Sequence, residues 1–184
     1  VRYSISGAAS LPSRIIEPWE ERTGGLLVEG YGLTETSPVL TINPLDDTRR
    51  AGTIGLPLPD TQLRIGDPHD LSRTQPDGEA GEILARGPQV FSGYLADAPA
   101  TAAAFHDGWF RTGDMGVREP DGHIRLVGRI KEIIITGGFN VYPGEVEEAL
   151  TSHPDIAQAA VVGVPRSDGS EDVAACAVSY THLT

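Results

Sequence analysis

The stretch GRIKEIIITGGFNVYPGEVE, residues 128–147, holds the pattern that decides the fold. Its apolar run at residues 132–136 predicts a buried strand, and Gly137-Gly138 ends that run with a turn. Pro143 stands near the first turn of a predicted helix, where early acids suit the helix dipole and Val146 and Leu150 share one face. Further strands are predicted at residues 157–165 and 171–178. The chain after residue 131 therefore predicts a small α+β unit.

The chain before this stretch predicts mostly sheet. Residues 53–117 are rich in turns and contain the short β-like runs TQLRIG and GEILARG. The turn Pro120-Asp121-Gly122 predicts a hairpin. We therefore place a domain junction at Arg129-Ile130-Lys131, with domains at residues 1–129 and 130–184.

A helix and a strand are predicted near the start of the chain. Apolar side chains recur at near-helical spacing from Leu11 to Trp19, and Pro18 predicts that the helix is short. Gly24-Gly25 is suited to end that helix. The run LLVE at residues 26–29 predicts a short buried strand that leads into a glycine-rich stretch.

Composition excludes several classes of partner. The 184 residues are 39% hydrophobic and carry 14 basic and 26 acidic side chains, a net charge of −12, which argues against nucleic acid or an anionic membrane as a partner. No apolar run is long enough for a membrane helix, and no signal peptide is recognisable, so we expect a cytoplasmic chain. The single cysteine, Cys176, lies in an apolar run and is expected to be buried. The sequence does not indicate an oligomeric state.

The segment EGYGLTETSPV, residues 29–39, combines groups that suit a nucleotide. Glycines allow close approach of the backbone, a tyrosine offers a stacking face, a threonine can donate to a phosphate oxygen, and a carboxylate can hold Mg²⁺. By itself this mixture is weak evidence, because a Thr-Glu pair is most often the start of a helix, and that interpretation would then be preferred.

Other motifs follow in order, and together they resemble a known family. They are SGAAS at residues 6–10, YGLTE at 31–35, RAGTIGLPLP at 50–59, GEILARGPQVFSGY at 81–94 and GWFRTGD at 108–114. With the Arg-x-Lys-Glu junction, this series resembles the adenylate-forming superfamily of acyl-CoA synthetases, luciferases and peptide-synthetase adenylation domains. It is most similar to ligases that join fatty acids or related acids to CoA. The implied fold class is α/β: the β-rich end of the large domain, joined by a hinge to part of a small α+β C-terminal domain.

The resemblance implies a reaction and a set of ligands. The parent enzyme would activate a small-molecule carboxylic acid with ATP to acyl-AMP, with Mg²⁺, and then transfer the acyl group to CoA. Tyr31 would stack on adenine and Glu29-Gly30 would lie near the base edge, with the backbone of Gly7, Ala8 and Ala9 on the other side of the base.

The resemblance also assigns the remaining site residues. Thr34 would contact the α-phosphate, Glu35 would bind Mg²⁺, and Asp114 would accept from the ribose hydroxyls. Arg129 would face the ribose and phosphates, Lys131 would be the pivot between the domains, and Gly137 and Gly138 would let the pantetheine arm pass.

Each assignment has an ordinary structural alternative. Tyr31 could be a core residue, Asp114 could cap a turn beside Gly113, and Arg129 and Lys131 could be exposed surface residues. Trp109 and Phe110 are predicted to belong to the core. The five histidines lack the spacing of metal ligands and are expected to be solvated or bonded locally: His69, His106, His123, His153 and His182.

The resemblance covers a fragment of the family pattern. The glycine-rich phosphate loop would precede Val1, and the lysine that drives adenylation would follow Thr184, so the chain alone is expected to be inactive. Residues 179–184, SYTHLT, do not continue the family pattern smoothly. Two alternatives to an acyl-CoA synthetase stay open: a non-catalytic AMP-binding module, and an adenylation domain that loads a carrier protein.

Overall fold

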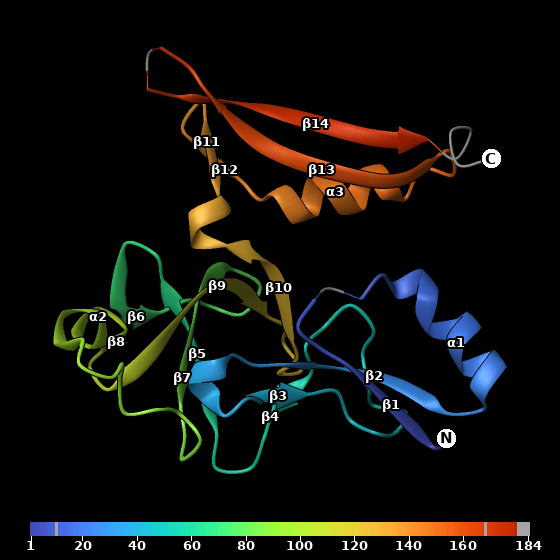
Figure 1. The fold of residues 1–184 in the computed structure, drawn as a ribbon, viewed down its shortest axis with the longest axis horizontal. Helices are drawn as coiled ribbons and strands as arrows, with labels where there is room; N and C mark the ends of the chain where they lie inside the picture. Colours follow the sequence, from blue (N-terminus) through green and yellow to red (C-terminus); the bar gives the residue numbers. More distant parts are fainter. Residues whose placement is uncertain (10, 168, 180–184) are drawn as a thin grey trace. The chain divides into compact units, whose positions relative to one another are not determined.

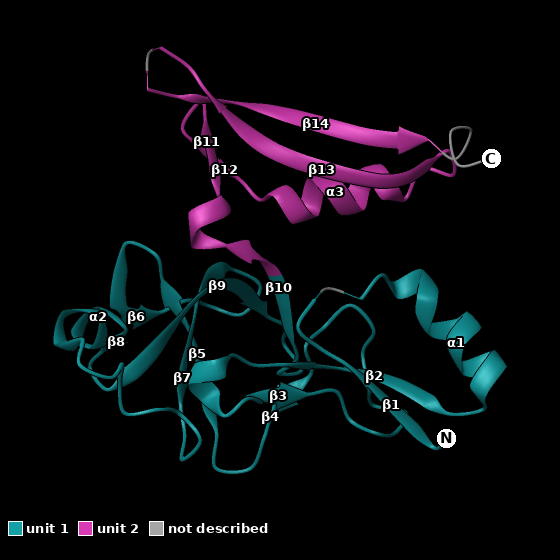
Figure 2. Cartoon of the chain, in the orientation of Figure 1, with its two compact units in different colours: residues 1–126 teal, residues 127–184 magenta. Residues whose placement is uncertain are grey.

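The chain folds into two units, residues 1–126 and 127–184, which Figure 2 distinguishes by colour. This computed structural model describes residues 1–9, 11–167 and 169–179. The division falls a few residues before the junction predicted at Arg129-Lys131 and lies inside strand β10 (Ile124–Arg129).

The first sheet of unit 1 has the order β1-β2-β3-β4. Strands β1 (Tyr3–Ser6) and β2 (Leu26–Tyr31) are parallel, whereas β3 (Thr41–Ile42) and β4 (Leu56–Pro57) extend the sheet antiparallel. Strand β1 is its edge, with Tyr3 50% and Ile5 64% exposed.

A short helical segment connects β1 to β2. It comprises the 3₁₀ turn η1 (Ser13–Ile15) and the helix α1 (Ile16–Thr23), as predicted from the apolar spacing. Gly24 follows in the left-handed conformation, with φ of 69°, and donates its N–H to Glu20 O at 2.8 Å. A glycine can adopt this conformation without a steric penalty, which explains why α1 ends there.

The second sheet of unit 1 confirms the predicted β-rich middle of the chain. Its order is β10-β9-β7-β5-β6, and β8 pairs with β9 (Figure 1). The bounds are β5 (Gln62–Asp67), β6 (Asp70–Thr74), β7 (Ala80–Arg86), β8 (Phe105–His106) and β9 (Trp109–Arg118). Helix α2 (Ala98–Ala103) precedes β8 and is capped by Asp97, whose carboxylate accepts from Ala100 N.

The core of unit 1 is built by side chains from both of its sheets. Tyr31 and Leu40 meet Ile65, Ile83, Phe110 and other apolar residues in one buried cluster, and the rings of Phe91 and Phe105 pack against it. The predicted core position of Phe110 is confirmed, since it is 2% exposed. Trp109 is half-buried instead, with the guanidinium groups of Arg64 and Arg86 5.0 and 4.6 Å from its ring centre.

Unit 2 has the α+β composition predicted from the 128–147 stretch. The 3₁₀ turn η3 (Ile130–Glu132) is followed by β11 (Ile134–Thr136), β12 (Phe139–Val141), α3 (Pro143–Thr151), β13 (Ile156–Pro165) and β14 (Glu171–Ser179). Helix α3 lies along β13 (Figure 1), and Glu147 Oε1 accepts from Val161 N at 2.8 Å. Strand β12 was not predicted, because its three residues carry no clear alternation.

The prediction that Cys176 is buried is wrong, because this thiol is exposed. Cys176 pairs with Ala160 across the β13–β14 hairpin, and Val162 and Val178, which are also exposed, occupy neighbouring pairs of the same face. Helix α3 packs against β13. An apolar run shows that a strand is suited to burial, but it does not show which face another element covers.

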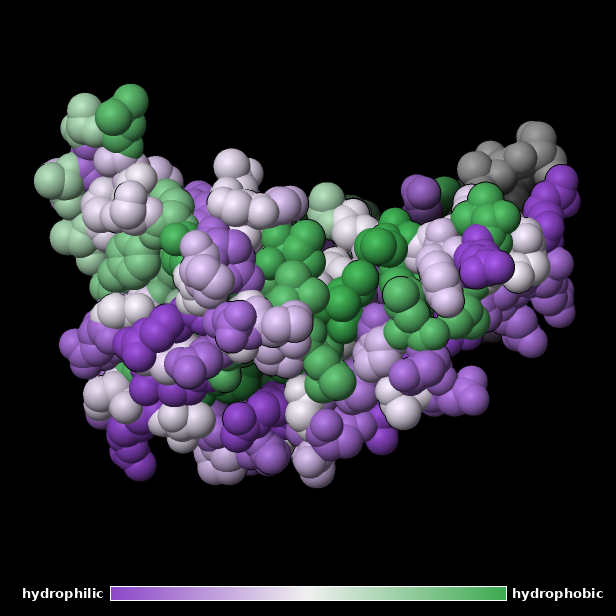
Figure 3. All heavy atoms as spheres, turned by 90° about the horizontal axis from the view of Figure 1, so that it is seen from below, coloured by the Kyte–Doolittle hydropathy of each residue, from purple (hydrophilic) through white to green (hydrophobic). Residues whose placement is uncertain are grey.

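The face drawn in Figure 3 carries both polar and apolar residues. Figure 3 shows apolar patches separated by polar side chains on the face seen from below. Exposed apolar side chains of unit 1 include Ile15 and Trp19 in addition to those of β1. Among the described residues, no helix combines the length and the apolar character that a membrane crossing requires.

Candidate functional site

Two motifs far apart in the sequence meet at a hydrogen bond inside unit 1. The Tyr31 hydroxyl donates to Asp114 Oδ2 at 2.7 Å, across 83 residues of chain. Tyr31 is the last residue of β2 and is 9% exposed, while Asp114 lies in β9 and is 6% exposed. The bond joins the YGLTE and RTGD segments in a largely buried environment, where such a bond is strong.

Asp114 owes its place to an irregularity in β9. Glu82 of β7 pairs with Met115 and Leu84 pairs with Arg111, so residues 112–114 stand opposite Ile83 alone. Gly113 at the centre of this bulge has a φ of 74°, which favours glycine. Asp114 also donates its N–H to Thr112 Oγ1 at 3.1 Å. The Asp114 carboxylate thus reaches Tyr31, while the Asp114 backbone belongs to the bulge.

The segment after Tyr31 forms the 3₁₀ turn η2 (Thr34–Thr36). The buried Thr36 fastens this turn, since its hydroxyl accepts from Leu33 N at 2.9 Å. Thr34 is exposed, and Glu35 is half-buried. Thr34 therefore presents its hydroxyl to solvent from a fixed turn.

Glu35 is held from the segment 87–94. Its Oε1 accepts from the Tyr94 hydroxyl at 2.9 Å, and its backbone carbonyl accepts from Phe91 N at 2.8 Å. The hydrogen bond to the Glu35 carboxylate raises the pKa of Tyr94 above its ordinary value, with burial of the phenol adding to the effect.

Gly32, the residue after Tyr31, has no room for a side chain. A Cβ atom on Gly32 would lie 1.7 Å from Pro38 O, a distance that no side chain can occupy. Gly32 therefore lets the chain fold back so that η2 follows β2 directly.

The ends of β1 and β2 bring two other predicted groups together. Ser6 pairs with Glu29, and a Cβ on Gly7 would lie 3.3 Å from Gly30 O. Gly7, Ala8 and Ala9 are exposed, and Ala8 has a left-handed φ of 67°.

The Glu29 carboxylate at this end is tied to a neighbouring loop. Its Oε2 accepts from Gly52 N at 3.0 Å. Burial raises the pKa of Glu29, while the Gly52 bond acts in the opposite direction.

The remaining predicted residues belong to unit 2. Arg129 is exposed at the end of β10, and Lys131 is exposed within η3. Gly137 and Gly138 form the two-residue turn between β11 and β12, with φ of 56° and 82°. Both positive values match the turn type that two-residue hairpin loops favour, which explains the glycine pair without reference to a ligand.

Three residues that contact the candidate site residues or the β9 bulge had no predicted role: Tyr94, Glu82 and Arg111. Tyr94 contacts Glu35, and the buried Glu82 contacts both Arg111 and the bulge before Asp114. The sequence could have indicated Glu82, because an acid within the apolar run GEILA is expected to be buried and then needs a hydrogen-bonding or charged partner.

His69 and His153 are exposed, as predicted for solvated or locally bonded histidines, whereas His182 lies outside the described residues. His123 is 4% exposed, and its Nδ1 lies 3.2 Å from Asp121 Oδ2, so it is buried beside a local partner. Within the described ranges, no group of three or more His, Cys, Asp or Glu side chains could hold a metal ion.

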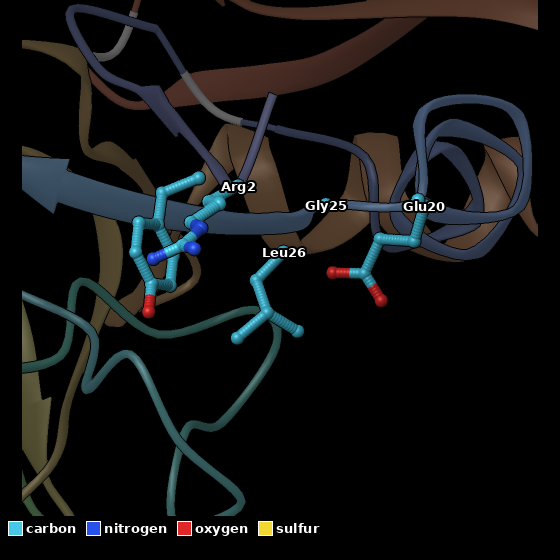
Figure 4. Close-up of a pocket in the computed structure, with 6 residues that line it drawn as sticks. Arg2, Glu20, Gly25 and Leu26 are labelled. Atoms are coloured by element: carbon cyan, nitrogen blue, oxygen red, sulfur yellow. The ribbon is translucent and has the colours of Figure 1, made fainter.

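A hollow in the surface of unit 1 lies away from these residues. It has a volume of about 530 Å³ and is lined by the start of β1, the end of α1 and the start of β2. Figure 4 shows Arg2, Glu20 and Leu26 around it. Glu20 is engaged there by Arg49, and the hollow is wide and open. We therefore centre the candidate site on Tyr31 and Asp114.

Sequence models of two families match the chain. One is described as AMP-binding enzyme and matches residues 1–95, and the other is described as the C-terminal domain of AMP-binding enzymes and matches residues 145–182. The first range contains the YGLTE segment, and the second contains most of α3 and all of β13 and β14.

Curated relatives and a solved structure agree with these matches. A long-chain-fatty-acid–CoA ligase of Yersinia pestis is 43% identical over 94% of the chain and 30% of its own length. An indoleacetate–CoA ligase of Aromatoleum aromaticum is 45% identical over 89% of the chain and 32% of its own length. The crystal structure of ATP-bound MatB from Rhodopseudomonas palustris is 40% identical, with a TM-score of 0.90, and the match covers 97% of this chain and 35% of that one.

The chain thus spans about 30% of the length of the curated relatives that it matches. The likeness of folds confirms the predicted fold class, the β-rich end of a large domain with part of a smaller α+β domain. Since the first family model alone matches more than half of the 184 residues, the chain belongs to the AMP-binding enzyme family.

Proposed function

We propose that this chain is part of an ATP-dependent acid–CoA ligase. Its first unit would bind the adenosine of ATP, and its second unit would be part of the small domain that takes part in thioester formation. The observation that carries this proposal is the bond between Tyr31 and Asp114, which joins the two motifs expected to hold adenine and ribose. Residues 1–129 would belong to the large domain and residues 130–184 to the small one.

The adenosine side is proposed from the geometry around that bond. Asp114 uses Oδ2 for Tyr31, and a carboxylate has lone pairs on two oxygens, so it can also accept from a ribose hydroxyl. The remaining exposed surface of the Tyr31 ring would meet the base. Gly7, Ala8 and Ala9 would lie on the other side of the base, with Glu29-Gly30 at its edge.

The phosphate side is proposed from η2. Thr34 would donate its exposed hydroxyl to the α-phosphate, and Glu35 would hold Mg²⁺. Their donor chemistry fits, because Mg²⁺ in nucleotide sites takes one or two carboxylates and completes its shell with phosphate oxygens and water. Such an ion neutralises phosphate charge during transfer of the adenylyl group. Arg129 would add a fixed positive charge toward the ribose and phosphates.

The chemistry would proceed in two halves. A carboxylate is a poor acyl donor because its oxygen leaves poorly, so ATP first converts that oxygen to the mixed anhydride with AMP and pyrophosphate departs. The thiolate of CoA then attacks the acyl carbon and AMP leaves. The small domain would rotate between an adenylating and a thioester-forming arrangement, with Lys131 as the pivot. Gly137-Gly138 would let the pantetheine arm pass close to the backbone.

A fatty acid is the first candidate for the acid, in a cytoplasmic enzyme. It is supported by the names of the long-chain-fatty-acid–CoA ligases among the relatives. An aryl-acetic acid is a second candidate, because the indoleacetate–CoA ligase is equally similar.

A substrate panel tests this proposal in a full-length protein that carries this sequence. Pyrophosphate release is measured with palmitate, octanoate, indoleacetate and malonate, each with and without CoA. Preference for a fatty acid supports the first candidate, and preference for indoleacetate replaces it by the second. Acyl-AMP formation without CoA consumption would indicate a carrier-protein acceptor, and no pyrophosphate release with any acid would indicate the non-catalytic AMP-binding module.

A further inference from the structure

Glu82 is a buried acid whose presence the fold alone does not require. It lies on β7 between apolar neighbours, and the residue is 1% exposed. Burial of a carboxylate is costly, and replacement of a buried ion pair by apolar side chains is often neutral or stabilising. A buried acid at such a position therefore suggests a role beyond stability.

The Glu82 carboxylate divides its two oxygens between two tasks. Oε2 accepts from Nε and Nη2 of Arg111, at 3.2 and 3.0 Å. Oε1 accepts from Gly113 N at 3.2 Å. The acid thus binds both Arg111, which precedes the β9 bulge, and Gly113 at the centre of the bulge.

The rest of the bulge is fastened to the neighbouring strand as well. Thr112 donates its hydroxyl to Ile83 O at 2.8 Å and accepts from Asp114 N at 3.1 Å. Because residues 112–114 stand opposite a single residue of β7, ladder pairing cannot fix them. These side-chain bonds take its place.

We propose that Glu82 is a positioning residue that, with Arg111, holds the β9 bulge in the shape that points the Asp114 carboxylate at Tyr31 and the ribose. This inference rests on the proposed function for the identity of the ligand. The placement of Asp114 by Glu82 stands on the geometry of unit 1 and can be tested without a ligand.

The chain offers a matched control for Glu82→Gln. Glu20 likewise binds an arginine and a backbone N–H: it contacts Arg49 through both of its oxygens and accepts from Leu27 N at 2.8 Å. Glu20 lies on α1 and contacts neither the bulge nor Tyr31. Glu20→Gln therefore removes a comparable set of bonds elsewhere in the same unit.

The first measurement uses no nucleotide. Amide hydrogen exchange is followed at Gly113 and Asp114 and, as a reference, at Ile65 in the core. In Glu82→Gln, exchange at Gly113 should accelerate roughly tenfold relative to Ile65, as expected for loss of one charge-assisted bond. Glu20→Gln should leave that ratio unchanged. An unchanged ratio in Glu82→Gln overturns the proposal, and if that variant does not fold, Arg111→Lys is measured instead and decides by the same criterion.

The second measurement asks whether placement of Asp114 matters to ribose recognition. In the full-length protein, affinities are compared for ATP and 2′,3′-dideoxy-ATP. The wild type and Glu20→Gln should prefer ATP by about tenfold or more, whereas Glu82→Gln and Asp114→Asn should lose most of this preference. A purely structural Glu82 would weaken both nucleotides equally, which overturns the proposal. If the wild type itself shows no preference, the proposed function is wrong, and the exchange experiment alone decides the role of Glu82.

Discussion

Tyr94, the last residue of the GEILARGPQVFSGY motif, donates its hydroxyl to the Glu35 carboxylate at 2.9 Å. It thereby contacts the carboxylate proposed to hold Mg²⁺. The Tyr94 ring is itself fixed by an edge-on contact with Phe91, with 4.9 Å between ring centres. A carboxylate held by a fixed phenol keeps one orientation, so the metal ligand would be organised before the nucleotide arrives.

The change Tyr94→Phe tests this organisation. The ring contact remains, but Glu35 loses a donor, so the Mg²⁺ concentration that gives half-maximal rate should rise roughly three- to tenfold. Initial rates of acyl-AMP formation against Mg²⁺ concentration measure it in the full-length protein. Tyr3→Phe on the exposed edge of β1 is the control. An unchanged Mg²⁺ requirement in Tyr94→Phe would show that the phenol does not organise Glu35.

The change Tyr31→Phe tests the bond at the centre of the candidate site. The ring keeps its packing but the Asp114 carboxylate loses one donor in a buried place, so the free energy of unfolding should fall by about 1–3 kcal/mol. Urea unfolding followed by fluorescence gives this value. If stability is lost but ATP affinity is unchanged, the hydroxyl serves only the fold.

The Glu20–Arg49 pair predicts a dependence of stability on pH. The hydrogen bond from Arg49 is the largest cause that lowers the pKa of Glu20 from 4.5 to about 2, and the Leu27 N–H adds to it. Because the folded pKa is depressed, the pair stabilises the fold fully above the unfolded value, and this stability is lost as pH falls from about 5 toward 2.

The change Glu20→Gln should remove this dependence. We expect a loss of about 0.5–1 kcal/mol at pH 7, which shrinks as pH falls toward 2, since the pair is partly exposed to solvent. Urea unfolding at pH 7, 5 and 3 measures it, with Glu17→Gln on the same helix as the control. Equal differences between wild type and Glu20→Gln at all three pH values would contradict the assignment.

The change Lys131→Pro tests the proposed pivot in the full-length protein. Proline fixes φ near −65°, so rotation between the two arrangements should be obstructed and thioester formation should slow more than acyl-AMP formation. Single-turnover formation of acyl-AMP, followed by its consumption by CoA, gives both rates. Lys131→Ala separates loss of the side chain from loss of backbone freedom, and equal losses in both half-reactions of Lys131→Pro would rule out the pivot.

The sequence predicted the elements of the fold better than their contacts. The short helix that ends at Gly24 and the helix that begins at Pro143 follow from local signals, because capping and periodicity act within a few residues. The exposure of Cys176 could not be predicted, since it depends on which face of the β13–β14 hairpin α3 covers. The local sequence shows that a strand is apolar, but the packing of distant elements determines which of its faces is buried.

The candidate site divides in the same way. The motifs nominate Tyr31 and Asp114 separately, but their contact depends on the register of β7 against β9 and on a bulge that no local pattern announces. Glu82 stood within a motif and still received no role, because its partners Arg111 and Gly113 lie about 30 residues along the chain.

Strand β1 has one further consequence for handling this chain. Among the described strands it pairs only with β2, so the N–H and C=O groups of its outer side have no strand partner there, and Tyr3 and Ile5 lie exposed beside them. Such an edge is a template to which a further strand can add. Chains produced at high concentration should therefore self-associate through β1, and a charge placed there, as in Ile5→Lys, should keep them apart without touching Tyr31 or Asp114.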